Sequence, residues 1–184
     1  MGIFLKIETM IGQLIRERSD IEIQATIIGA VSKSKASRQE LNKINQVIEK
    51  QKIGPNLTFK GYCDHETLIH SATEHDIFIS PSVTATDGDT EGGAPVTIIE
   101  MAAAGLPIIS TTHCDIPFVL AENNRKLLVA ERESSSLCRV MSWLVEHPDE
   151  WRTIALQNRQ HIESKFDIRN QGTTLANIYN ELIS

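Results

Sequence analysis

The residues best suited to chemistry lie between Ser80 and Thr112 of this 184-residue chain. Two adjacent glycines, Gly92 and Gly93, come shortly before an Ala-rich segment with the composition of a helix. Free amides at the start of a helix attract an anion such as diphosphate, and glycines let the backbone approach that anion closely. A tight turn with no ligand would also use two glycines, so this pattern alone leaves both interpretations open.

Glu100 lies on the same predicted helix, about one and a half turns after its start. A carboxylate at this position could accept two hydroxyl protons from a ribose. A solvated surface Glu is the alternative, and it is the commoner situation. However, the neighbouring residues are apolar, and a carboxylate among apolar residues needs a partner.

The acidic loop before the glycines offers a second interpretation. Asp87, Asp89 and Glu91 alternate with other residues, and such carboxylates suit Mg²⁺, Mn²⁺ or Ca²⁺. A solvated acidic turn is the alternative. His113 follows a predicted strand and could contact a phosphate, although an ordinary loop His fits equally well. No Cys/His or Ser/His/Asp grouping has enough sequence context to predict nucleophilic catalysis.

Short apolar strands alternate with longer helices through the first 130 residues, which predicts parallel strands joined by right-handed crossovers. We therefore expect an α/β, doubly wound parallel sheet of Rossmann type, formed by one domain over residues 1–184, with a helical C-terminal tail. The chain opens with a helix where such a fold normally opens with a strand. The expected strands are 21–29, 57–61, 76–81, 107–111 and 126–129, and the expected helices are 4–18, 38–52, 64–74, 95–104, 116–121, 134–146, 148–164 and 169–183.

Composition excludes several classes of protein. Lys and Arg number 18 against 24 for Asp and Glu, and this net charge of −6 argues against a nucleic-acid partner. The three cysteines are widely spaced and form no disulfide framework, which favours a reducing, cytoplasmic location. No apolar run approaches the roughly 20 residues of a transmembrane helix. The start of the chain also lacks the pattern of a signal peptide.

The segment from Glu100 to Thr111, Glu-Met-Ala-Ala-Ala-Gly-Leu-Pro-Ile-Ile-Ser-Thr, together with Glu91, resembles the signature of family 4 retaining glycosyltransferases of the GT-B architecture. The resemblance covers essentially the whole chain and is nearest in character to bacterial exopolysaccharide and capsule enzymes. It extends to Gly29, to residues 57–62, 76–82 and 116–117, and to Leu127-Leu128-Val129.

This resemblance implies a C-terminal, donor-binding domain of a hexosyltransferase that transfers a sugar to an alcohol with retention. Glu91 would be the catalytic residue near the reacting sugar carbon, and Glu100 would hold the ribose hydroxyls. UDP-sugar is the expected donor and GDP-sugar the alternative, with no metal and no cofactor. The implied donor-binding residues are Gly92, Gly93, Ala94, Val96, Thr97, Glu100, Tyr62, Cys63, Ser82 and Gly29.

The chain also departs from the family pattern. Eight residues separate Glu91 from Glu100, one more than usual, and the family's first strand and its acceptor domain are absent. We therefore expect a fragment truncated at the N-terminus, inactive alone, with an interrupted sheet and a tendency to form a homodimer. A non-catalytic nucleotide-binding module, an inert remnant and a metal site at Asp87, Asp89 and Glu91 remain the alternatives. Attachment to the inner face of the membrane is the alternative to a free cytoplasmic location.

Overall fold

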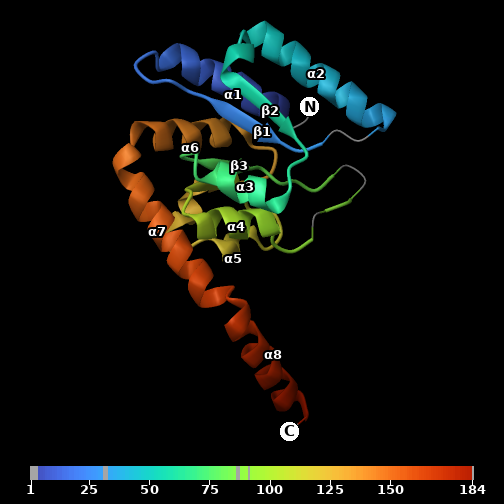
Figure 1. Cartoon of the computed structure of the whole chain (residues 1–184), viewed down its shortest axis with the longest axis vertical. Helices are drawn as coiled ribbons and strands as arrows, with labels where there is room; N and C mark the ends of the chain where they lie inside the picture. Colours follow the sequence, from blue (N-terminus) through green and yellow to red (C-terminus); the bar gives the residue numbers. More distant parts are fainter. Residues whose placement is uncertain (1–3, 31–32, 86–87, 91, 184) are drawn as a thin grey trace. The chain divides into compact units, whose positions relative to one another are not determined.

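The structure is a computed structural model, and it describes residues 4–30, 33–85, 88–90 and 92–183. Contacts within the chain group these residues into two compact units, Met1–Leu68 and Ile69–Ser184, called unit 1 and unit 2 below. Figure 1 shows the elements of both units. That residues 1–184 act as one nucleotide-sugar-binding domain stays a prediction.

Unit 1 consists of two helices and a two-stranded parallel sheet. Helix α1 (Phe4–Glu17) packs closely on α2 (Lys35–Gln51), and Gly12 suits this contact because a Cβ would lie only 3.0 Å from the Gln51 Cβ. Strand β1 (Ala25–Ile28) pairs with β2 (Leu57–Gly61), which follows the short 3₁₀ helix η1 (Gly54–Asn56). The carboxyl ends of β1 and β2 therefore lie side by side.

Unit 2 is built on a three-stranded parallel sheet with the order β3-β4-β5. Helix α3 (His65–Ala72) contains the boundary between the units and precedes β3 (Phe78–Ser80). Strand β4 (Ile108–Thr111) lies between β3 and β5 (Leu128–Val129), and all four of its residues are buried. This buried central strand lies in the core of the unit.

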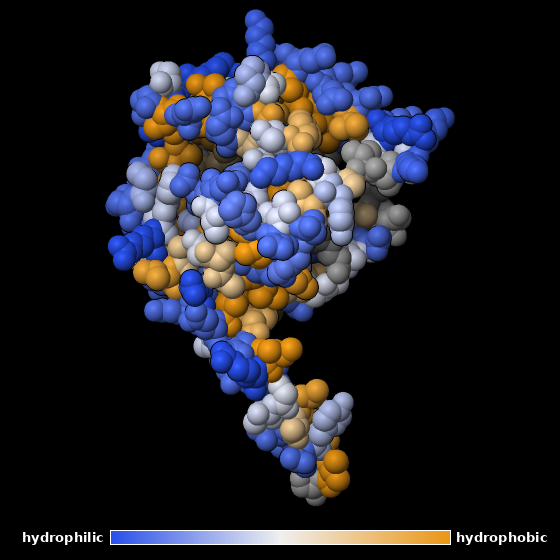
Figure 2. Space-filling model, viewed as in Figure 1, coloured by the Kyte–Doolittle hydropathy of each residue, from blue (hydrophilic) through white to orange (hydrophobic). Residues whose placement is uncertain are grey.

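The other helices of unit 2 follow in chain order. They are α4 (Val96–Ala104), α5 (Ile116–Val119), the 3₁₀ helix η2 (Glu122–Leu127), α6 (Ser134–Glu146), α7 (Pro148–Lys165) and α8 (Ile168–Ile183). Helix α7 packs against α4, α5 and α6. Helix α8 contains no buried residue, and Figure 2 shows apolar side chains on its surface.

The structure confirms the predicted α/β class, the parallel pairing and the helical tail. The described strands form two sheets and not one continuous sheet, in agreement with the expected interruption. The strand predicted at 126–129 is shorter than expected, because the 3₁₀ helix η2 occupies the chain up to Leu127. Among the described residues, no helix is long and apolar enough to cross a membrane.

Candidate functional site

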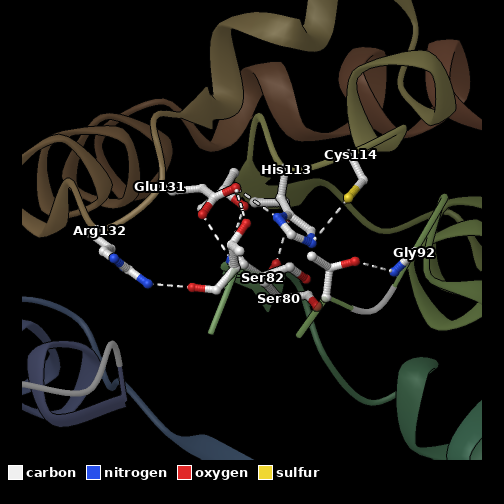
Figure 3. A network of polar contacts seen from close by, with 11 residues as sticks. Ser80, Ser82, Gly92, His113, Cys114, Glu131 and Arg132 are labelled. Carbon is white, nitrogen blue, oxygen red and sulfur yellow. Dashed lines mark hydrogen bonds and ion pairs between the residues drawn. The ribbon is translucent and has the colours of Figure 1, made fainter. Parts of the chain in front are cut away.

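The candidate site of unit 2 lies at the carboxyl ends of its three parallel strands. The hydroxyl of Ser110 donates to the Ser80 carbonyl at 2.5 Å, and the hydroxyl of Thr111 donates to the Ser82 carbonyl at 2.5 Å (Figure 3). These bonds attach the segment after β3 to the end of β4. Loops at this edge of a parallel sheet are the usual position of a ligand site in α/β folds.

The Gly92-Gly93 turn has a backbone that favours glycine. The φ angles are 58° at Gly92 and 62° at Gly93, in the left-handed region that other residues adopt only with strain. The Gly92 amide donates to the Thr90 hydroxyl at 3.1 Å, and the Asp115 amide donates to the Gly93 carbonyl at 3.4 Å. The two glycines therefore form a tight turn that contacts the loop after β4.

Helix α4 begins directly after this turn. Pro95 is its N-cap residue, so the first helical amide belongs to Val96. The amides of Val96 and Thr97 belong to the first turn, where helix geometry provides no carbonyl partner. Both residues are exposed, whereas Ala94 is half-buried. This helix start can therefore donate amide hydrogens to an anion.

Glu100 lies one turn further along α4 and is half-buried. The residues on either side of it along the helix, Ile98, Met101 and Ala102, are buried in the core of unit 2. The structure therefore places Glu100 and the first-turn amides on one nine-residue helix. The predicted role of Glu100 in holding a ribose stays a prediction.

Glu91 and Asp87 lie outside the described residues, so the predicted catalytic residue and the alternative metal site at Asp87, Asp89 and Glu91 have no structural account here. Asp89 is described and exposed, and its carbonyl accepts from the Ala85 amide at 2.8 Å. Within the described ranges, the structure brings together no group of three or more His, Cys, Asp or Glu residues that could hold a metal ion.

Ser82 is buried beside the edge of the sheet, with 8% of its surface exposed. Its amide donates to the Ser80 carbonyl at 3.0 Å, and its own carbonyl accepts from Thr111. The backbone of Ser82 thus connects the ends of β3 and β4. Its predicted contact with the donor stays a prediction.

The remaining predicted donor-binding residues, Gly29, Tyr62 and Cys63, belong to unit 1. The Gly29 amide donates to the Gly61 carbonyl at 2.8 Å, which joins the carboxyl ends of β1 and β2. Tyr62 is 83% exposed, and the Cys63 thiol lies 3.9 Å from the Lys60 carbonyl. The structure thus places these three residues at one edge of the unit 1 sheet.

A buried histidine–glutamate pair was not predicted from the sequence. His113 is only 1% exposed, and its Nδ1 lies 2.7 Å from Glu131 Oε1. The other carboxylate oxygen of Glu131 accepts from the Thr84 amide at 2.8 Å. The Arg132 guanidinium also donates to the Thr84 carbonyl (Figure 3).

This network joins the three loops that follow β3, β4 and β5, because Thr84, His113 and Glu131 come from one loop each. The hydrogen bond from His113 is the main reason that the pKa of Glu131 lies below its usual value, and the Thr84 amide adds to it. Hydrogen bonds to a carboxylate favour its charged form. The sequence signal was weak, since Glu131 lies 18 positions after His113.

These features define a class: an α/β protein with a glycine turn and a helix start at the carboxyl edge of a parallel sheet, as in nucleotide-binding folds. Residues 2–147 match the family described as "Glycosyl transferases group 1", and the chain belongs to this family. The family assignment confirms the resemblance inferred from the sequence.

A curated relative agrees with this assignment. The amylovoran biosynthesis glycosyltransferase AmsK of Erwinia amylovora is 32% identical over 122 residues, which cover 66% of this chain and 30% of AmsK. The chain thus spans about a third of the length of this curated relative.

Two solved structures show the same fold. Anabaena HepE in complex with UDP has a TM-score of 0.76 at 16% identity, covering 96% of this chain and 44% of HepE. The C-terminal domain of the group 1 glycosyl transferase LpcC from Francisella tularensis has a TM-score of 0.70 at 15% identity, covering 91% and 83%. The predicted likeness to the C-terminal domain of a GT-B glycosyltransferase is therefore confirmed at the level of the fold.

Proposed function

We propose that this chain is the part of a glycosyltransferase that binds the sugar-nucleotide donor. The observation that supports the proposal best is the Gly92-Gly93 turn leading directly into the exposed first turn of α4. Backbone amides at a helix start, with the helix dipole behind them, are a suitable binding site for diphosphate. The leaving diphosphate gains negative charge as the glycosidic bond breaks, so fixed donors there also lower the barrier to transfer.

The proposed ligand is a nucleoside diphosphate, with UDP first and GDP as the alternative. The structural neighbour HepE was solved with UDP, which supports this order. In the proposed arrangement the amides of Val96 and Thr97 contact the diphosphate, and the Glu100 carboxylate accepts the ribose hydroxyls. Glu91 remains the proposed catalytic residue, and the transfer reaction is proposed for the full-length protein.

Replacing Val96 with proline tests the diphosphate contact. Proline is well tolerated at the first helical position, so Val96→Pro removes one amide hydrogen while the helix stays intact. The backbone of Pro95, with φ −59° and ψ 127°, also suits a residue that precedes proline. Since a hydrogen bond to a charged group contributes about 1.5 kcal/mol, we expect the Kd of UDP to rise by roughly tenfold.

The matched control is Val96→Ala, which shortens the same side chain and keeps the amide. Isothermal titration calorimetry would measure the Kd values of UDP, GDP and uridine for the parent chain, Val96→Pro and Val96→Ala. Uridine lacks the diphosphate, so its binding should be the same in Val96→Pro and Val96→Ala. Equal UDP affinity in these two variants would contradict the diphosphate contact.

Replacing Glu100 tests the ribose contact separately. We expect Glu100→Ala to weaken both UDP and uridine by tenfold or more, because the ribose loses its acceptor. Glu146→Gln, at the end of α6, serves as the control for a change of one negative charge. Unchanged affinity for UDP in Glu100→Ala would count against this role.

A further inference from the structure

An exposed thiol lies next to a buried base at the carboxyl edge of the unit 2 sheet. Cys114 is exposed, and its sulfur lies 3.3 Å from Nε2 of His113. His113 is buried, with 1% of its surface exposed, and its two ring nitrogens face the Cys114 thiol and the Glu131 carboxylate (Figure 3). The sequence alone gave no reason to single out this pair.

The hydrogen-bond network determines which nitrogen of His113 carries the proton. An ionised carboxylate only accepts hydrogen bonds, so His113 must donate from Nδ1 to Glu131 at 2.7 Å. Nε2 of the neutral ring is then an acceptor, and it faces the Cys114 sulfur. The Thr84 amide, 2.8 Å from the same carboxylate, holds Glu131 in place. A base directed at a nucleophile and oriented by a third group is the arrangement that activates thiols in proteins.

We infer that Cys114 is an activated thiol and a site of modification by low-molecular-weight disulfides. The Cys114 thiol gives its proton to His113 Nε2, and Glu131 stabilises the resulting imidazolium. The thiolate attacks one sulfur of the disulfide, so that a new S–S bond forms while the original S–S bond breaks. The leaving thiolate takes the proton from His113, and the protein ends as a mixed disulfide with one thiol released.

The modified thiol would lie beside the Gly92-Gly93 turn. Asp115, the next residue, donates its amide to the Gly93 carbonyl at 3.4 Å, and a Cβ at Gly93 would lie 3.7 Å from Asp115 Oδ2. Cys114 itself has a φ of 44°, in the left-handed region. The inference about the thiol stands on the Cys114–His113–Glu131 geometry and does not depend on the proposed donor site.

The test measures the rate at which Cys114 reacts with 2,2′-dithiodipyridine, an uncharged disulfide whose released product absorbs light. The Cys63→Ser/Cys138→Ser chain contains Cys114 as its single thiol, since the sequence has three cysteines. The reference is a free peptide of residues 110–118, in which the same thiol has no folded neighbours. Folding can only reduce access to a thiol, so a faster reaction in the folded chain requires activation.

We expect the folded chain to react about five- to tenfold faster than the peptide at pH 7. An unassisted thiol in a free peptide is only a few per cent thiolate at this pH, which limits the rate of the reference peptide. A rate equal to or below that of the peptide would overturn the inference. Peptide mapping of the native three-cysteine chain should find the first adduct on Cys114, and a first adduct on Cys63 or Cys138 would also overturn it.

The variant Glu131→Gln separates activation from simple exposure. Glutamine keeps the size of the side chain and loses the negative charge, so the reaction should slow to about the rate of the peptide, whereas looser loops alone would expose Cys114 more and speed the reaction. Arg139→Gln, on α6, is a control at a residue that contacts Ser136 and not the His113 network. An unchanged rate in a folded Glu131→Gln chain would refute the role of the His113–Glu131 pair.

Discussion

The two units bury their sheets to very different degrees. In unit 2, every residue of the central strand β4 is buried. In unit 1, the residues of β1 and β2 are half-buried or exposed, and Phe59 leaves 50% of its surface exposed. A parallel sheet is normally covered on both faces, and β4 of unit 2 meets this rule whereas β1 and β2 of unit 1 do not. The candidate diphosphate site therefore lies on the better-packed sheet, where a fixed backbone can hold amides in place.

Each unit also contains a carboxyl group with a shifted pKa, and the two shifts have opposite directions. Glu8 on α1 of unit 1 is 1% exposed, and its Oε2 has no hydrogen-bond partner among the described residues. Burial raises the pKa of Glu8 to about 7. Glu131 of unit 2 is paired with His113 and the Thr84 amide, and these bonds lower its pKa. The carboxyl of Glu131 is therefore held in its charged form, whereas burial favours the neutral form of Glu8.

The largest expected effect compares the two sheets directly. Ile109, in β4, is fully buried, and Ile109→Ala should destabilise unit 2 by roughly 3 kcal/mol through lost burial and a new cavity. Ile27, in β1, is half-buried, and Ile27→Ala should destabilise unit 1 by only about 1 kcal/mol. Hydrogen exchange followed by mass spectrometry measures the stability of peptides from each unit separately. Equal losses of stability in the two variants would contradict the inference that β4 is better packed than β1.

A smaller effect is expected from Glu8. The pKa of this carboxyl is raised from 4.5 to about 7 in the folded chain, so its contribution to stability is fully present below pH 4.5 and is lost as the pH rises to about 7. Glutamine resembles the neutral carboxyl. Glu8→Gln should therefore stabilise unit 1 at pH 8 by on the order of 2 kcal/mol and change little at pH 4.5.

The control for Glu8 is Glu49→Gln, an exposed carboxyl on α2 of the same unit. Urea unfolding at the two pH values, followed by far-ultraviolet circular dichroism, gives the free energies. If the gain in Glu8→Gln were the same at both pH values, ionisation of a buried carboxyl would not explain it.

Much of the fold could be predicted because its signals are local. The left-handed φ of 93° at Gly105, at the end of α4, follows from a glycine after an Ala-rich helix. The Asp64 carboxylate accepts from the Thr67 amide at 2.8 Å at the start of α3, and Asp before a helical segment is likewise a local signal. Strand ends were less predictable, because the ends of β1 and β5 depend on pairing with distant residues.

The candidate site was predicted only where it is continuous in sequence. Gly92, Gly93 and the start of α4 follow one another, so their proximity could be read directly. The contact between His113 and Glu131 depends on β4 and β5 ending at the same edge, which periodicity does not reveal. Cys114 and His113 are neighbours in sequence, yet their chemistry depends on a carboxylate that only the fold supplies.

The smallest expected effect is acid sensitivity at Glu131, and it has the opposite sign to that of Glu8. A lowered pKa means that the contribution of Glu131 to stability is present above its usual value of 4.5 and is lost as the pH falls through the lower, folded value. Fluorescence of Trp143 and Trp151, which are both in unit 2, follows unfolding between pH 6 and about pH 2. The Glu131→Gln chain should be less stable than the parent chain at pH 6, and the difference should shrink as the pH falls.

The control is Glu146→Gln, whose difference in stability from the parent chain should not shrink as the pH falls. A difference that stayed constant for Glu131→Gln would mean that the carboxylate charge does not hold the three loops together.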